Sequence, residues 1–329
     1  MTSQLPAGGA TQGAPGATGA TVTSPVARRA RPPRRRRLTL RGRRQAIGAL
    51  MAAPAVAMIT VFFLVPLGLT FYMSLNQWSL LGAHTWIGFD NYTRAFSDAN
   101  FRDAFVFTLE YTAVVTPVLF LIGLGLALLV RRPRRGARVF QSVYFMPVVI
   151  GFAASSFLWL YMGQPGLGPL FDLFRRVGLT NPDTNWFADR QSALFYVVLS
   201  VAWKFVGMQM LLLLAGLQSI PIEVEEAARI DGAGRWQTFR YITIPLLRPT
   251  LALVLVFSVA GSLLAFDQFF IMTNGGPNNS TITAVYQIYR VSFVQFQLGY
   301  GAALSVLLMI VLAAVSAMQL LLLRNSDHN

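Results

Sequence analysis

Residues 218–249 read QSIPIEVEEAARIDGAGRWQTFRYITIPLLRP and separate two long apolar runs, 193–217 and 250–271. At about 1.5 Å per residue, a helix over either run is long enough to cross the roughly 30 Å hydrocarbon core of a bilayer. The stretch between the runs carries helix-start, stop and turn signals, so it is more than a plain connector. We therefore expect two membrane spans joined by an ordered loop.

The first half of this loop predicts a short helix. Pro221 suits the first position of a helix, where a backbone N–H would be unpaired in any case. Carboxylates follow where the positive end of the helix dipole favours them, namely Glu223, Glu225 and Glu226. Asp231 and Gly232 then indicate a stop and a sharp turn, since glycine tolerates a left-handed conformation.

The second half of the loop predicts another short helix, over about residues 234–242. Trp236, Phe239 and Ile242 recur every three residues and would form an apolar stripe. Two short helices with acidic and aromatic faces are typical of a docking element. An amphipathic hairpin on the lipid surface is the alternative, but inner-leaflet lipids are anionic and would repel the carboxylates.

The rest of the chain carries more apolar runs. Hydrophobic residues make up 54% of the chain and charged residues 12%, whereas a soluble domain carries about 25% charged residues. Pro245 is expected to end the second short helix, and Pro249 to begin the next span. We expect an all-α integral membrane protein with six transmembrane helices, over residues 47–75, 107–130, 139–161, 193–217, 250–271 and 301–323.

Arginines give the expected orientation. Ten lie between Arg28 and Arg44 and five between Arg131 and Arg138, which accounts for most of the formal net charge of +14. With the 218–249 loop and the C-terminus, these segments hold 20 arginines against six in the alternate segments. The positive-inside rule then places both termini in the cytoplasm of a multi-pass protein of the inner (cell) membrane. No basic stripe is interleaved with exposed aromatics, so no nucleic acid partner is expected.

Residues that carry chemistry are few. The chain has no cysteine, and its two histidines, His84 and His328, lie far apart in the sequence, so we expect no metal site. The only lysine, Lys204, lacks the glycine-rich run of a phosphate-binding loop, so the chain cannot be a P-loop ATPase. Since no convincing acid–base pair is present either, we expect no catalytic residues, no enzyme activity and no cofactor.

The 218–249 loop resembles the EAA motif of binding-protein-dependent ABC permeases. It matches the form E-A-A-x-x-D-G-A-x₅-F-x₂-I-x₂-P-x₃-P at every fixed position. The matching residues are Glu226, Ala227, Ala228, Asp231, Gly232, Ala233, Phe239, Ile242, Pro245 and Pro249. Other segments resemble the maltose-type sugar branch of this family: 88–92 (GFDNY), 266–268 (FDQ), 273–277 (TNGGP) and 299–303 (GYGAA).

This resemblance implies the type I ABC importer permease fold, and a permease subunit that forms the path for a sugar delivered by an extracytoplasmic binding protein. Residues 221–244 would be the coupling helix, seated in a separate ATPase subunit that binds the ATP. Glu226 and Asp231 would hold this hairpin and contact the ATPase, while Gly232 permits the turn. The implied partners are a second homologous permease subunit, two ATPase subunits, the binding protein and the lipid bilayer.

Polar residues within the expected spans are candidates for the substrate path. Lys204 lies near the middle of the fourth span, where a charge usually faces a cavity or a partner. A structural ion pair or interhelical hydrogen bond is the alternative for Lys204. Gln209, Asp267 and Gln268 are further candidates.

Two other functions stay open. One is the same type of importer for glycerol 3-phosphate or a related polyol. The other is an ATP-independent secondary transporter, which would be expected to place several charged groups within its spans. Only Lys204 is deeply placed in this sequence, which disfavours the secondary transporter.

We expect four regions along the chain. Residues 1–45 would be a disordered, Arg-rich cytoplasmic tail, because residues 1–27 carry almost no large apolar side chains. Residues 46–103 would form the first transmembrane helix and an outer loop, and 104–323 the permease core with five transmembrane helices. Residues 324–329 would be a short cytoplasmic tail.

Overall fold

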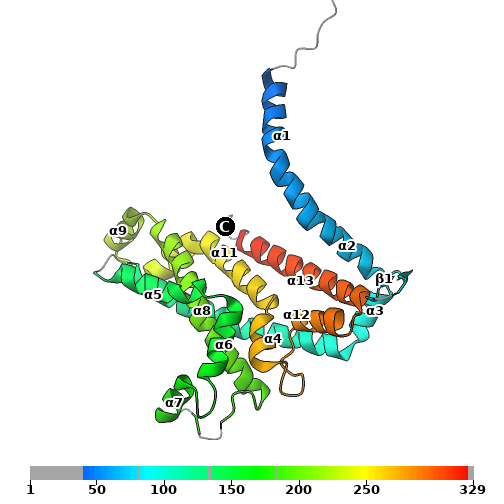
Figure 1. Cartoon of the computed structure of the whole chain (residues 1–329). Helices are drawn as coiled ribbons and strands as arrows, with labels where there is room; N and C mark the ends of the chain where they lie inside the picture. Colours follow the sequence, from blue (N-terminus) through cyan, green and yellow to red (C-terminus); the bar gives the residue numbers. More distant parts are fainter. Residues whose placement is uncertain (1–39, 81, 132–134, 179, 182–183, 325–329) are drawn as a thin grey trace, which may run out of the picture. The chain divides into compact units, whose positions relative to one another are not determined.

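The computed structural model describes residues 40–80, 82–131, 135–178, 180–181 and 184–324. These residues are almost entirely helical (Figure 1). The chain divides into two compact units, Met1–Ala57 and Met58–Asn329, and each is considered by itself. The expected tails fall largely outside the described residues. Helix α1 begins at Leu40, within the last residues of the segment expected to be disordered.

The helices differ widely in length, from four residues to 32. In chain order they are α1 (Leu40–Ile59), α2 (Val65–Ser74), α3 (Asp90–Ser97), α4 (Ala99–Val130), α5 (Ala137–Val149), α6 (Phe152–Met162), α7 (Pro169–Arg176), α8 (Arg190–Gln218), α9 (Ile222–Ile230), α10 (Arg235–Thr238), α11 (Ile244–Leu263), α12 (Ala284–Tyr289) and α13 (Leu298–Arg324). Short π-helical segments are η1 (Thr60–Leu64), η2 (Phe239–Thr243), η3 (Phe269–Thr273) and η4 (Arg290–Val294). Strands β1 (Asn76–Gln77) and β2 (Thr85–Trp86) pair antiparallel.

Five helical runs among the described residues are long and apolar enough to cross a membrane. They are Ile47–Ser74, Ala99–Val130, Arg190–Gln218, Arg235–Leu263 and Leu298–Leu321. Helices α5 and α6 would form a sixth span if they are counted together, although they are bent by 99°. The all-α membrane class is confirmed, and the six predicted spans correspond to these five runs and the bent pair.

The prediction of one continuous helix over 139–161 is wrong. Helix α5 ends at Val149, and Ile150 and Gly151 are extended, with ψ angles of 131° and 146°. Pro147 lies in the last turn of α5 and cannot donate a hydrogen bond to the carbonyl four residues before it. The helix is therefore weakened just before the point where the chain turns.

The predicted start of the next span at Pro249, and the predicted helix end at Pro245, are also wrong. Helical structure runs from Arg235 to Leu263 with both prolines inside it, and it stops short of the expected residue 271. The π-helical segment η2 directly precedes Pro245, and Ile244 N–H bonds to Phe239 O across this widened turn. A widened turn accommodates the prolyl ring and its missing hydrogen bond without ending the helix.

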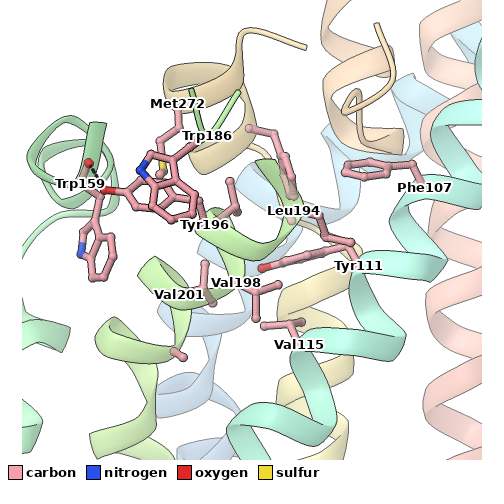
Figure 2. Packing of buried hydrophobic residues seen from close by; sticks show 14 of the residues in the cluster. Phe107, Tyr111, Val115, Trp159, Trp186, Leu194, Tyr196, Val198, Val201 and Met272 are labelled. Carbon is pink, nitrogen blue, oxygen red and sulfur yellow. Dashed lines mark hydrogen bonds between the residues drawn. The ribbon is translucent and has the colours of Figure 1, made fainter. Parts of the chain in front are cut away.

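The main core lies between α4 and α8, which form the most extensive helix pair of the second unit. Tyr196 of α8 is fully buried at its centre and donates a hydrogen bond to the carbonyl of Trp159 at 2.7 Å. The Trp186 ring stacks on Tyr196 with centroids 5.2 Å apart, and Tyr111 reaches in from α4 (Figure 2). This aromatic cluster sets the spacing of the two helices near one end of the bundle.

The segment after α2 is tied down by Asn91 of the GFDNY stretch. Its buried side-chain amide donates to the carbonyls of Ser74 and Asn76, at 2.9 and 3.0 Å. The C-terminal end of the same segment is held by Tyr300 of α13, whose hydroxyl donates to Asp98 at 2.7 Å. Helix α13, which carries the GYGAA stretch, therefore packs against α3, which begins within the GFDNY stretch.

Candidate functional site

The loop between α8 and α11 forms an ordered bend, which we call the elbow (residues 221–243). Its first arm, α9, ends in a complete left-handed cap. Gly232 has φ +82°, its N–H bonds to Arg229 O at 3.2 Å, and Ala233 N–H bonds to Ala228 O at 2.9 Å. These are the two hydrogen bonds of a Schellman motif, so the predicted stop and turn at Asp231 and Gly232 are confirmed.

The second arm of the elbow begins at Arg235 and does not end within the loop. Gln237 caps its start, because the Gln237 side-chain oxygen accepts a hydrogen bond from Gly234 N–H at 2.8 Å. Trp236 and Phe239 lie side by side with ring centroids 5.8 Å apart. The arm then continues through η2 into α11, so the elbow and the span form one helical rod.

The first arm is attached to the bundle by an ion pair. Arg131, just after α4, pairs with Glu225 in the first turn of α9. The same guanidinium donates to the carbonyl of Leu217 near the end of α8, at 3.5 Å. Ala228 of the motif is buried, with 6% of its surface exposed. The ends of α4 and α8 and the start of α9 are thus held together.

The opposite face of the elbow is open among the described residues. Glu226, Ala227 and Asp231 are exposed. Large apolar side chains of the elbow are exposed as well, with exposed fractions of 86% for Ile230, 71% for Trp236 and 72% for Tyr241. This surface mixes carboxylates with apolar and aromatic groups, which favours a protein partner.

A cavity of about 190 Å³ lies between α4, α8 and α11. Its polar lining consists of five neutral side chains: Tyr111, Gln209, Ser258, Ser262 and Gln268. The rest of its wall is mainly apolar and includes the rings of Phe152, Phe205 and Phe257. No charged side chain of the described residues lines it.

Two of the predicted path residues are brought to this cavity. The Gln209 amide donates to Ser258 Oγ, and its buried oxygen Oε1 has no hydrogen-bond partner among the described residues. Gln268 donates to the Tyr111 hydroxyl at 3.3 Å. Gly123 on α4 permits this arrangement, because a Cβ there would lie 2.8 Å from the Cβ of Gln209.

The other two predicted path residues do not line this cavity. Lys204 is buried and donates to the backbone carbonyls of Pro147 and Ile150, at the break between α5 and α6. Asp267 is half-buried beside Gln268. The interhelical hydrogen bond weighed for Lys204 is therefore present in the structure.

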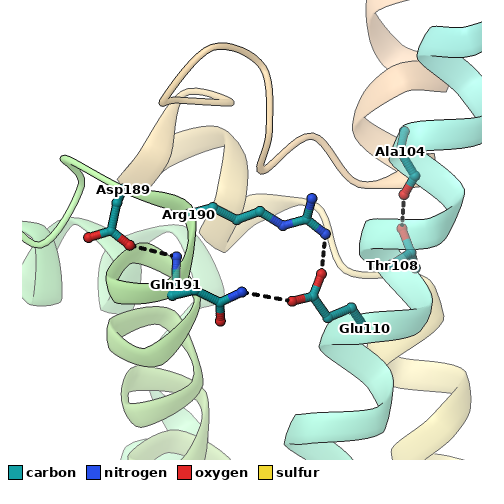
Figure 3. Close-up of polar contacts among 6 residues, drawn as sticks. All are labelled: Ala104, Thr108, Glu110, Asp189, Arg190 and Gln191. Atoms are coloured by element: carbon teal, nitrogen blue, oxygen red, sulfur yellow. Dashed lines mark hydrogen bonds and ion pairs between the residues drawn. The ribbon is translucent and has the colours of Figure 1, made fainter.

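At the start of α8, the end away from the elbow, Glu110 of α4 bonds to residues of α8 (Figure 3). Its carboxylate pairs with Arg190 and accepts a hydrogen bond from the Gln191 amide at 3.3 Å. Asp189 caps α8 by accepting from the backbone N–H groups of Gln191 and Ser192, at 2.9 and 3.0 Å. Sequence reasoning did not identify the pairings of Glu110, because Arg190 and Gln191 lie 80 and 81 residues further along the chain.

Sequence reasoning also missed Arg131, Glu225 and Tyr111 as site residues. By sequence, Arg131 belongs to the arginine bias that orients the chain, and Glu225 to the carboxylates favoured at the start of a helix, so neither is predicted to have a partner. Their pairing joins two segments that no local pattern connects. One signal in the sequence could have suggested the pair. Arg131 directly follows the apolar run 107–130, and the 218–249 loop, expected on the same side of the membrane, carries several carboxylates.

A helical membrane bundle with an ordered elbow, exposed on one face, and a cavity between its spans that carries neutral polar side chains defines a transport protein of the permease type. A family model described as "Binding-protein-dependent transport system inner membrane component" matches residues 119–326. The chain therefore belongs to this family, and it is a permease subunit of an ABC importer. The resemblance inferred from the EAA motif is confirmed.

Individual relatives agree with this assignment. A "Probable ABC transporter permease protein" of Pyrococcus horikoshii is 33% identical over 268 residues, which cover 81% of this chain and 91% of that protein. The sn-glycerol-3-phosphate transport system permease protein UgpA of Yersinia pestis is 32% identical over 274 residues, covering 82% and 91%. A solved bacterial ABC transporter involved in the import of the acidic polysaccharide alginate has a TM-score of 0.75 at 22% identity, covering 86% and 96%, and shows the same fold.

Proposed function

We propose that this chain forms one half of the translocation path of an importer for a neutral sugar. Its partners are a second homologous permease subunit, two ATPase subunits and an extracytoplasmic substrate-binding protein. The chain itself carries out no catalysis, because ATP is bound and hydrolysed by the separate subunits. The observation that carries this proposal is the structure of the elbow. The Arg131–Glu225 ion pair holds one face to the bundle, and the other face is exposed.

Because the elbow is rigid, it transmits the movement of an ATPase subunit to the spans. Glu226 and Asp231 contact the ATPase, together with the exposed apolar side chains around them. The second arm runs on into α11 as one helical rod, so a displacement of the elbow displaces the span directly. The Arg131–Glu225 pair carries the same displacement to α4 and α8.

The orientation that this mechanism needs agrees with the arginine distribution. The 218–249 loop and both termini lie in the cytoplasm, on the side rich in arginine. Glu110, Arg190 and the β1–β2 segment then lie toward the extracytoplasmic side, where the binding protein delivers the substrate. In this orientation the cavity lies between the two faces of the membrane.

The cavity favours a neutral, polyhydroxylated substrate. Amide and hydroxyl groups hydrogen-bond to sugar hydroxyls, and aromatic rings pack against the apolar faces of sugars. A phosphate or carboxylate ligand would favour arginine or lysine in the lining, and none is found among the described lining residues. The unpaired Oε1 of Gln209 is available to accept a hydrogen bond from a substrate hydroxyl.

Import of glycerol 3-phosphate is the second candidate, and the name of the Yersinia pestis relative favours it. For this candidate, the positive charge that the phosphate needs would have to come from the partner permease. A secondary transporter is the third candidate, and it would need no ATPase. The chemistry of the cavity and the energy source of uptake separate the three.

The test is uptake by the complete complex reconstituted in proteoliposomes. Labelled maltose and glucose serve as neutral probes, and labelled glycerol 3-phosphate and an alginate oligosaccharide as anionic probes. We expect uptake of a neutral probe that requires both internal ATP and the binding protein. Uptake of an anionic probe alone would contradict the neutral substrate, and uptake without ATP would contradict the importer mechanism.

A further inference from the structure

Lys204 lies at the midpoint of α8, 14 residues from each end of Arg190–Gln218. At about 1.5 Å per residue, each end of the helix is roughly 21 Å away. Its side chain is buried, with 4% of the residue exposed. The Nζ atom donates to Pro147 O at 3.3 Å and to Ile150 O, both at the break between α5 and α6.

Pro147 O already accepts a hydrogen bond from Ile150 N–H at 3.3 Å, so Lys204 is its second donor. The carbonyl of Ile150 lies just past the end of α5, and Lys204 donates to it from α8. The last carbonyls of any helix lack the N–H groups that the next turn would supply, and the chain is extended at Ile150 and Gly151. Inside a membrane, water does not replace the missing donors, and each unpaired group is costly. A cation at the negative end of a helix dipole is also favourable.

Two aromatic rings also lie close to the ammonium group. Nζ lies 5.4 Å from the ring centroid of Phe152 in α6 and 5.6 Å from that of Phe205 in α8. Both distances fall within the range of cation–π attraction. The ammonium group therefore finds its hydrogen-bond acceptors and its aromatic neighbours within this chain, and the carbonyls at the break gain a donor.

A second contact holds α5 against α8 one turn further along. Gly207 packs directly on the backbone of α5, and a Cβ at this position would collide with the carbonyl of Tyr144. The end of α5 is thus held to α8 at two neighbouring points, by the buried cation and by direct backbone contact.

We propose that Lys204 is a positioning residue that locks the α5–α6 break onto α8. The bent pair then moves with α8 as one body, and the break is a fixed angle in the fold. Phe152 and Phe205 also line the cavity, so Lys204 sets the shape of the cavity wall without contacting the substrate. The effect of Lys204 on transport rests on the proposed function, whereas its effect on the angle of the break does not.

The first test measures the angle of the break in the complete complex. The chain has no cysteine, so spin labels can be attached at V139C on α5 and F157C on α6, two positions that are 68% and 60% exposed. The complex without this cysteine pair gives the background signal. We expect one narrow distance distribution that broadens or shifts in K204M, which keeps a long side chain but has no donor.

Matched variants separate the lock from a general loss of structure. K204R keeps donors and charge, and we expect it to restore the narrow distribution. S200A, one turn earlier on α8, removes a hydroxyl that donates to Val197 O in α8 and lies 3.8 Å from Met272 Sδ in η3. Neither partner belongs to α5 or α6, and we expect the distribution to stay unchanged. An unchanged distribution in K204M would overturn the proposal, as would a failure of K204R to differ from K204M.

The second test is uptake of the transported probe by the same variants. We expect K204M to lower the maximal rate about tenfold, while the KM for loaded binding protein changes less than about twofold, because the substrate does not contact Lys204. A large rise in KM with an unchanged rate would overturn the positioning role. If wild type takes up no neutral probe, the proposed function fails, while the distance measurement still decides the lock.

Discussion

Arg131 and Glu225 join the end of α4 to the first turn of α9, and their side chains are 23% and 19% exposed. A half-buried ion pair at this place fixes the elbow to the bundle by charge, while its outer face stays open. The pair lies beside the carbonyl of Leu217, to which Arg131 also donates. Three helix ends therefore meet at one guanidinium.

A charge swap tests this clamp. R131E and E225R each place like charges side by side, and we expect each to lower ATP-dependent uptake by about fivefold, the equivalent of roughly 1 kcal/mol. The double variant R131E/E225R restores the attraction and most of the uptake. R131E/E223R is the control, because Glu223 is exposed on the same helix and should not rescue R131E. A double variant no better than the singles would contradict the clamp.

The left-handed cap of α9 predicts a strict requirement at Gly232. A Cβ at Gly232 would meet nothing within 4 Å, so any effect of substitution comes from the backbone angle of +82°. A left-handed L-residue costs roughly 1–2 kcal/mol, and asparagine less than a β-branched residue. We expect uptake to fall steeply in G232V and G232P and mildly in G232N, at equal protein levels.

Gly234 provides the matched control for that series. Its φ of −67° suits any residue, and the nearest atom to a Cβ there would be Gln237 Oε1 at 3.6 Å. We expect G234V to keep near-normal uptake. Equal losses in G232V and G234V would show that the bend tolerates no side chain at all, for reasons other than the left-handed cap.

Gln209 tests the cavity. Replacing its amide by an apolar side chain in Q209L removes the bond to Ser258 and the free acceptor. A hydrogen bond is worth about 1 kcal/mol, so we expect kcat/KM for uptake to fall about five- to tenfold. Q319L makes the same change in α13, away from the cavity, and is expected to have little effect. Equal effects of the two variants would remove Gln209 from the substrate path.

Asn91 tests the outer segment. N91L leaves the buried carbonyls of Ser74 and Asn76 without their donor, which costs about 1–3 kcal/mol. We expect a lower midpoint of thermal unfolding for the purified complex. T93V is the control, because that exposed hydroxyl bonds only within its own helix, to Asp90 O. A midpoint unchanged in N91L would show that the segment is held by other contacts.

Local patterns predicted much of this molecule. Apolar run length predicted the spans, and Asp231-Gly232 predicted the cap of α9, because each depends on the residues of one segment. Pro245 and Pro249 misled the prediction, because a proline ends a helix only where the neighbouring turn cannot adapt. The π-helical turn before Pro245 makes that adaptation, and no local signal announces it.

Other features depend on contacts between distant segments. The break at Ile150 and Gly151 follows Pro147, which lies within an apolar run. An apolar run with a proline often stays helical in membranes, so the sequence does not predict the break. Its stability comes from Lys204, more than 50 residues further along the chain. The sequence predicted that Lys204 lies deep within a span but not which residues it contacts. Periodicity within α8 does not reveal which neighbouring helix supplies the carbonyls.

The most direct measurement concerns Glu226, the exposed carboxylate of the elbow. Because the chain has no cysteine, E226C is the only position in it that a membrane-impermeant maleimide can label. We predict labelling of this chain in inside-out vesicles and none in right-side-out vesicles, with protection when the ATPase subunits are assembled. Labelling from the outside would contradict the account, since no cytoplasmic ATPase could then reach the elbow.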